Sequence, residues 1–177
     1  MGTTDSEKML EGMTDAKPQA QHRWLEQLVG EWTFVSECPA APVGTAQQFA
    51  GVESVRSLGG LWIVAEGRGE MPGGGEGQML MTLGYDPQRG RYVGSWCGSM
   101  MTHFWVYDGE LDADERVLTL YAEGPACDAQ GNVTDKPAKF KDVIERISAD
   151  ERTLTGHMLG EDGQWQQLMT ARYRRTK

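Results

Sequence analysis

The 177-residue sequence has no apolar run approaching the 18 residues that a membrane-spanning helix requires, so no transmembrane helix is expected. Its N-terminus also lacks the basic flank and apolar centre of a secretory signal. Three cysteines, Cys38, Cys97 and Cys127, lie far apart and form no CxxC pair. This usage predicts reduced thiols in a cytoplasmic protein and no disulfide framework.

Positive charge is scarce as well, since 17 Lys and Arg stand against 26 Asp and Glu, for a net charge of −9. A surface of this sign repels phosphates and anionic lipids, so neither nucleic acid nor a membrane is expected as a partner. The sequence contains no GxSxG or HExxH motif of the kind found in serine hydrolases and zinc proteases. The stretch 71–77, MPGGGEG, lacks the Lys-Ser/Thr of a phosphate-binding loop.

The length is that of one domain with a single substantial core. Residues 1–17 form a polar, acidic leader that we expect to be disordered, and residues 18–177 form the domain. A helix is predicted over 18–29, with proline in its first turn, an apolar stripe at i, i+4 and i+8, and Gly30 at its end.

From residue 31 the apolar period becomes two, and clusters of turn residues separate ten candidate strands. The predicted strands are 31–38, 47–58, 61–70, 78–85, 90–97, 102–110, 115–123, 139–148, 152–160 and 164–175. The longest connection, 124–137, is rich in turn formers and is expected to be exposed. Ten successive antiparallel strands favour a closed up-and-down barrel, because closure leaves no unpaired strand edge. The predicted fold class is therefore all-β with one short N-terminal helix, and such a barrel is wide enough for a ligand cavity.

A short motif at the start of the first strand, Gly30-Glu31-Trp32, resembles the G-x-W pattern of lipocalins and related calycin barrels. In those folds the tryptophan packs near the closed end, and an arginine from the last strand lies across it. By this resemblance Gly30 and Trp32 are the structural signature, and Arg172 and Arg174 in TARYRR are the arginines expected to cover the indole.

A longer resemblance covers roughly residues 20–175. The segments that carry it include LVGEW, GVESVRSLGGLWIVAEG, LMTLGYDPQRGRYVGSW, SMMTHFWVYDGEL and KFKDVIE. Together they are similar to a bacterial family of domains of unknown function with a lipocalin-like (calycin) barrel. The resemblance implies the barrel and no activity, because a shared fold does not carry a shared function.

Alternation collects methionine, tryptophan and tyrosine side chains with a single histidine on one face of the sheet, which we assign to the cavity. Methionine fills irregular space, and aromatic rings contact flat ligands. The predicted ligand-binding residues are Met81, Trp96, Met101, His103, Trp105, Arg146, Trp165 and Met169. The alternative is an interior that these side chains fill completely.

The predicted strand 139–148 leaves its orientation open. If the face with Phe140, Asp142 and Arg146 points inward, its two charges are buried and need partners. Arg146 would then anchor a ligand carboxylate, and Asp142 would orient His103 for acid/base chemistry. If the face points outward, both are ordinary surface charges.

The favoured function is binding of a small apolar or amphipathic molecule in the barrel. The alternative is an isomerase, hydratase or lyase that uses His103 as its acid/base. A haem-binding barrel comes third: nitrobindin-like barrels also have about ten strands and bind haem through a late histidine, which by that similarity would be His157. Their glycine-rich run after G-x-W is replaced here by TFVSECPAAP.

No other cofactor and no metal are predicted. Cys97, Met100, Met101 and His103 are soft enough for Cu(I), but strand alternation divides such donors between two faces. A homodimer is left open.

Overall fold

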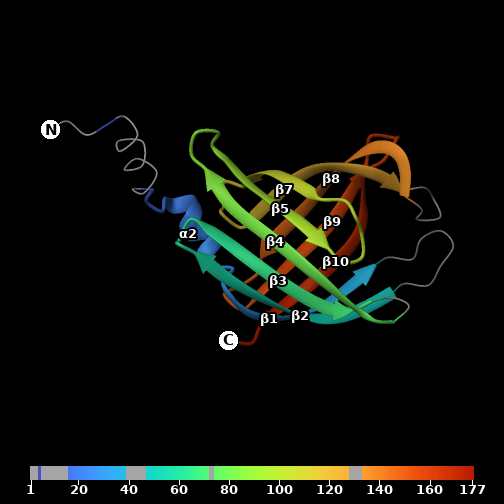
Figure 1. Ribbon diagram of the computed structural model, residues 1–177, viewed down its shortest axis with the longest axis horizontal. Coiled ribbons are helices and arrows are strands. Elements are labelled where there is room, and N and C mark those ends of the chain that lie inside the picture. Colours follow the sequence, from blue (N-terminus) through green and yellow to red (C-terminus); the bar gives the residue numbers. More distant parts are fainter. Residues whose placement is uncertain (1–3, 5–15, 39–46, 72–73, 128–132) are drawn as a thin grey trace.

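The computed structural model describes residue 4 and residues 16–38, 47–71, 74–127 and 133–177. Ten antiparallel strands form a closed barrel with one short helix, α2 (Ala20–Glu26), at one end (Figure 1). The strands are β1 (Gly30–Cys38), β2 (Gln47–Leu58), β3 (Trp62–Glu70), β4 (Glu76–Asp86), β5 (Arg91–Gly98), β6 (Trp105–Leu111), β7 (Val117–Cys127), β8 (Val133–Arg146), β9 (Glu151–Leu159) and β10 (Trp165–Arg175). This architecture confirms the predicted fold class, all-β with one short helix. Alternation and turn residues had located all ten strands.

Each strand pairs with the next along the chain, and the first and last strands close the barrel. In this seam Trp32 lies opposite Arg175, and Phe34 lies opposite Tyr173. Inward residues of all ten strands alternate with outward ones, which is why the predicted period of two extends over almost the whole domain. The expectation of a disordered leader over 1–17 falls mostly outside the described residues.

Helix α2 covers the end of the barrel at which β2 turns into β3. Its Trp24 is buried and donates an Nε1 hydrogen bond of 2.7 Å to the carbonyl of Glu115. Leu25 and Leu28 are also buried in the core. Trp24 and Leu28 of the predicted apolar stripe therefore face the barrel interior, as expected of an amphipathic helix, whereas Ala20 at its start is exposed. Among the described residues no helix has the length and apolar character needed to cross a membrane.

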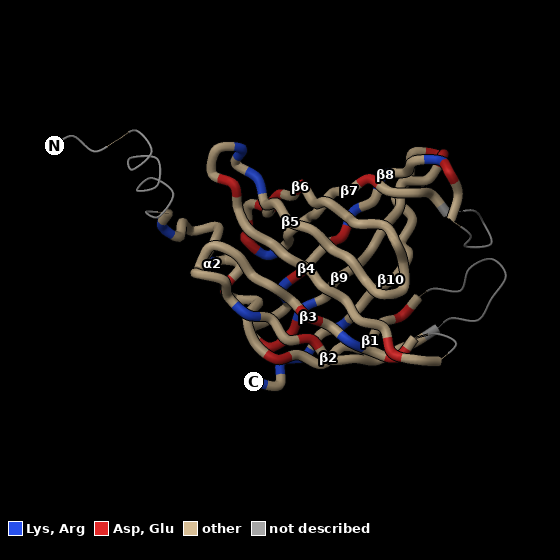
Figure 2. The backbone as a smooth tube through the Cα atoms, viewed as in Figure 1, with Lys and Arg blue, Asp and Glu red and all other residues tan. Residues whose placement is uncertain are grey.

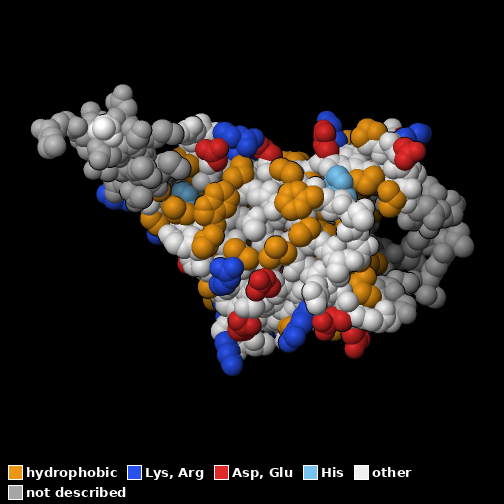
Figure 3. Space-filling model, in the orientation of Figure 1, with side chains coloured by type: hydrophobic (Ala, Val, Ile, Leu, Met, Phe, Trp, Pro, Cys, Tyr) orange, Lys and Arg blue, Asp and Glu red, His pale blue; other side chains and the backbone are white. Residues whose placement is uncertain are grey.

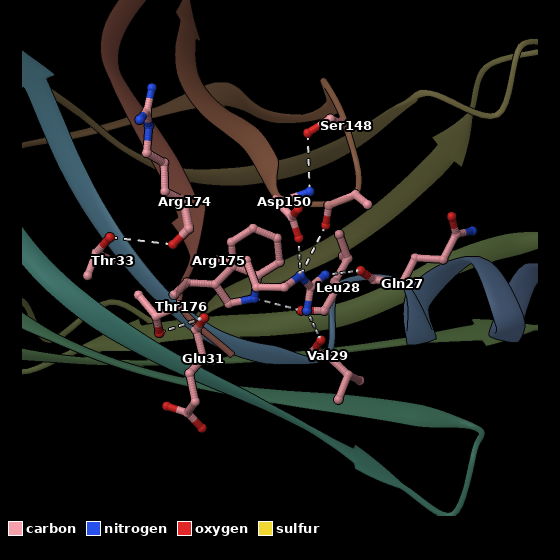
Figure 4. A network of polar contacts seen from close by, with 12 residues as sticks. Gln27, Leu28, Val29, Glu31, Thr33, Ser148, Asp150, Arg174, Arg175 and Thr176 are labelled. Carbon is pink, nitrogen blue, oxygen red and sulfur yellow. Dashed lines mark hydrogen bonds and ion pairs between the residues drawn. The ribbon is translucent and has the colours of Figure 1, made fainter.

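The last residues of the chain attach the end of β10 to the segment after α2 (Figure 4). The Arg175 guanidinium donates to the carbonyl of Val29 and, at 2.9 Å, to the carbonyl of Gln27. The backbone amide of Thr176 donates to the carbonyl of Glu31 at 2.7 Å. The bond to Gln27 satisfies the carbonyl of the residue that caps the C-terminus of α2, and the other two connect β10 to the start of β1.

The predicted end of the strand 115–123 and the predicted start of the strand 139–148 differ from the structure. Much of the connection 124–137, expected to be an exposed loop, continues β7 to Cys127 and begins β8 at Val133. Pro125 lies opposite Pro137, and a register shift follows, so both prolines belong to a strand pair with an irregular ladder.

The outer face of the barrel over β4 and β5 is almost free of charge (Figures 2 and 3). Charged residues stand only at the first and last positions of β4 and at the first of β5. Outward apolar side chains on and beside these strands are exposed, among them Phe104 at 57% and Val106 at 64%. Isolated surface apolar residues are common, so the uncharged face is a property of the sheet and defines no site by itself.

Candidate functional site

A cavity of about 780 Å³ occupies the barrel between the core below and the strand connections away from α2. Its wall is apolar and aromatic, and includes Phe34, Phe49, Met79, Leu154 and Ala171. Exposed or half-buried methionines of the β3–β4 and β5–β6 connections, Met71, Met100 and Met101, lie at its rim. The volume lies within the range of small-molecule sites in proteins.

Most of the side chains predicted from alternation line this cavity. They are Met81, Trp96, Met101, His103, Trp105 and Met169. Alternation is clearest on two neighbouring strands: β4 presents Met79 and Met81, and β5 presents Trp96 directly opposite Met81. Two of the eight predicted residues, Trp165 and Arg146, lie elsewhere.

Trp165 does not line the cavity, contrary to the prediction. A register shift between Gln167 and Met169 places one extra residue in β10. The shift reverses the alternation, so Met169 faces inward while Trp165 lies on the other side of the sheet. There the ammonium of Lys141 sits 4.6 Å from the centre of its ring, a cation–π contact.

The open question about the strand at 139–148 is answered by burial, because Phe140 and Ile144 are core residues and Asp142 lines the cavity. Arg146 shares this face but lies opposite Arg152 at the end of β8, below the cavity. Arg146 is therefore not a lining residue, because the cavity ends before the strand does.

A half-buried acid and a buried phenol form the main polar feature of the cavity wall. The Tyr107 hydroxyl on β6 donates a hydrogen bond to Oδ2 of Asp142 on β8. Burial raises the pKa of Asp142, and the hydrogen bond from Tyr107 opposes part of that rise. Burial, followed by the charge of Asp142, also raises the pKa of Tyr107 well above its usual value.

His103 lies in the connection before β6 and not within a strand as predicted. Its Nε2 is 3.2 Å from the carbonyl oxygen of Glu123, and its ring meets Trp105 edge to face at 4.6 Å between centroids. Trp105 in turn meets Phe140 at 4.7 Å. Of the predicted pair, Asp142 therefore contacts Tyr107 while His103 contacts a backbone carbonyl, and the structure does not bring the two together as an acid/base dyad.

Trp32 of the G-x-W motif is buried and lies between two guanidinium groups. Arg175 is 4.2 Å and Arg152 is 4.8 Å from its ring centre. The predicted arginines, Arg172 and Arg174, are instead exposed. Ala171 and Tyr173 are the inward residues of this part of β10, so alternation turns Arg172 and Arg174 outward.

Among the described residues, Arg152 is the one buried Lys or Arg, and it belongs to a group that the sequence analysis did not identify. Its guanidinium forms an ion pair with Glu53 and lies 3.9 Å from the ring centre of Tyr173. Burial, then the charge of Glu53, raises the pKa of Tyr173. The inward alternation of Arg152, Leu154 and Gly156 on β9 was a usable signal, but the partner Glu53 is 99 residues away.

Ser36 was also missed, although it lines the cavity and is fully buried. Among the described residues its hydroxyl has no hydrogen-bond partner. His157, the histidine named by similarity to haem barrels, is among the lining residues of β9. Burial, then the charge of Lys141, lowers the pKa of His157. In the part of the chain that the structure describes, no three His, Cys, Asp or Glu side chains are grouped as metal ligands.

The fold and the site together define a class: closed ten-stranded antiparallel barrels, consistent with a lipocalin-like fold, with one end covered by a helix and an apolar cavity inside. Within that class, the chain belongs to the DUF1579 family, described as protein of unknown function, whose model matches residues 17–175. The resemblance found in the sequence is thereby confirmed at the level of the family.

The solved structures to which this chain is similar have little sequence in common with it. The crystal structure of Rv2717c from M. tuberculosis is 12% identical, covers 91% of this chain and all of that chain, and gives a TM-score of 0.58. A barrel named EF1p2_mFAP2b, bound to DFHBI, is 14% identical over 89% of this chain and all of that chain, with a TM-score of 0.46. A comparison with curated proteins found no match.

Proposed function

We propose that the protein binds a small apolar or amphipathic molecule inside the barrel. The observation that carries the proposal is the cavity of about 780 Å³ with its wall of methionine and aromatic side chains. Protein interiors are normally close-packed, and side chains that line a cavity lose van der Waals contacts. A cavity of this size therefore favours a role in binding a ligand, which would restore those contacts. Methionine adapts to irregular shapes, while Trp96 and Trp105 offer flat surfaces to a ring system.

The position of the cavity supports the same function. Helix α2 and the core beneath it cover one end of the barrel, and the methionines Met100 and Met101 at the other end are exposed. A ligand entering past flexible thioethers would lose water contacts over most of its surface, which is how small-molecule sites gain affinity. Asp142 with Tyr107 and the hydroxyl of Ser36 are the polar groups that would orient it.

Titration with Nile red, a neutral dye whose fluorescence rises in apolar surroundings, tests the proposal. We expect saturable binding to the wild type and at least tenfold weaker binding to Met81→Arg, because a charged side chain hydrates the apolar wall. Leu80→Arg is the matched control, since Leu80 is the neighbouring residue on the exposed face. Its affinity should equal that of the wild type.

Thermal unfolding of both variants establishes that they are folded, and Met169→Trp provides a second, uncharged obstruction of the same cavity. Equal affinity in Met81→Arg, Met169→Trp and the wild type would place the dye elsewhere and refute the proposal. So would the absence of saturable binding.

A further inference from the structure

The carboxyl of Asp142 lies in the cavity wall without a counter-charge. Within the described residues it accepts a hydrogen bond from Tyr107 and takes part in no ion pair. Its other oxygen, Oδ1, lies 3.2 Å from the position that a Cβ would occupy on Gly156, so the bare glycine leaves it room. A buried carboxyl normally has a cationic partner or stays neutral.

The buried guanidinium of Arg152 already has an acidic partner. Arg152 is paired with Glu53 and covered by the rings of Tyr173 and Trp32. The ammonium of Lys141 lies over Trp165, on the other side of the sheet from the carboxyl of Asp142. Among the described residues, the Asp142 carboxyl therefore faces the cavity with no cation paired to it.

The surroundings of that carboxyl are of the kind that binds organic cations. Tyr107 donates a hydrogen bond to the Asp142 carboxyl, and Phe140 is the inward residue that precedes Asp142 on β8. Trp105 packs edge to face against Phe140 at 4.7 Å, and Met169 lies beside Gly156. Aromatic faces attract ammonium groups through the ring quadrupole, most strongly where water is excluded.

We propose that the ligand is an organic amine with a flat apolar body, whose ammonium pairs with Asp142 while its body lies between Trp96, Trp105 and the methionines. This inference rests on the proposed function and specifies the ligand's chemical class. The net charge of −9 favours the approach of a cation over that of an anion. It also reverses the expectation from sequence, in which Arg146 was to anchor a carboxylate.

The pairing makes affinity depend on pH. Burial raises the pKa of Asp142, so at low pH the site is neutral and an ammonium gains little from it. The other titratable residues that line the cavity are Tyr107 on β6, Tyr173 on β10, His103 before β6, His157 on β9, Lys141 on β8 and Glu70 on β3. Of these, Lys141 directs its ammonium to the Trp165 ring. Amine affinity should rise with pH as Asp142 ionises, and a neutral ligand should show no such rise.

Three probes with one ring system separate the head groups: 1-naphthylmethylamine, 1-naphthylmethanol and 1-naphthoate, each titrated calorimetrically into the full chain at pH 8. We expect the amine to bind at least tenfold more tightly than the alcohol, the range of a charge-assisted hydrogen bond in a buried site. In Asp142→Asn this preference should fall below about twofold. The matched control Asp114→Asn, at an exposed turn, should keep it.

The Nile red titration of Asp142→Asn shows whether that variant keeps a folded, usable cavity. Equal or tighter binding of the alcohol or the naphthoate, or an amine preference that survives in Asp142→Asn, overturns the amine inference. If Nile red binds the wild type but none of the naphthalene probes does, the amine inference fails and the proposed function stands. If Nile red does not bind either, the proposed function fails with it.

Discussion

Replacing Glu53 by leucine would leave the Arg152 guanidinium inside the barrel without its counter-charge. The two side chains are 13% and 4% exposed, and the guanidinium is enclosed by Trp32 and Tyr173. Removing one partner of a buried ion pair costs about 3–5 kcal/mol, because the remaining charge stays desolvated. For a domain of this size that corresponds to a fall in Tm of about 6–20 °C. Calorimetric melting at neutral pH measures it.

The exposed ion pair Arg174–Glu151 provides the control. Its side chains are 79% and 44% exposed, so Glu151→Leu should cost no more than about 1 kcal/mol. The double variant Glu53→Leu/Arg152→Met removes both buried charges and should recover most of the lost stability. If Glu53→Leu melts within a degree or two of Glu151→Leu, or if the double variant is no better than the single one, the account of this pair is wrong.

Two further predictions concern packing and pH. Gly94→Ala should destabilise the barrel by about 1–3 kcal/mol, since its Cβ would lie 1.9 Å from the carbonyl oxygen of Thr82. Gly67→Ala should cost less in the same urea titrations, because the nearest atom to its Cβ would be the terminal methyl of Met79 at 3.3 Å; equal costs would contradict this. Because burial raises the folded-state pKa of Asp142, the folded protein holds that proton more tightly, and the free energy of unfolding should fall as pH rises from about 4 through the raised pKa. Asp142→Asn lacks this dependence and should gain stability relative to the wild type between pH 4 and 8, whereas parallel Tm curves would show that the carboxyl is not desolvated.

The strands were predictable because alternation and turn chemistry are local. Each of the ten predicted strands corresponds to one strand of the barrel, with ends that differ by a few residues. The largest difference lies at 124–137, where glycine and two prolines indicate a loop. In the barrel these prolines face each other across an irregular ladder, which no local pattern distinguishes from a turn.

The site was less predictable because it depends on which face of a strand each residue occupies and on contacts between different strands. Six of the eight predicted residues line the cavity, although Met101 and His103 do so from the β5–β6 connection and not from a strand. Alternation failed for Trp165, because a single shift of register in β10 reverses which face a residue occupies. Arg146 lies on the inward face of β8, as one of the two orientations predicted, but at the end of the strand and beyond the cavity. The contact of Tyr107 with Asp142 joins β6 to β8 and cannot be read from either strand alone.

The seam between β1 and β10 determines when the barrel can be completed. Every other strand pair joins neighbours in the chain, whereas Thr33 and Arg174, which share a hydrogen bond across the seam, are 141 residues apart. The hairpins can form as soon as their two strands exist, but the seam carries the loop-closure entropy of almost the whole domain. During synthesis β1 keeps an open edge until the last strand is released. The acquisition of the cavity, and with it any ligand, is therefore among the final events of folding.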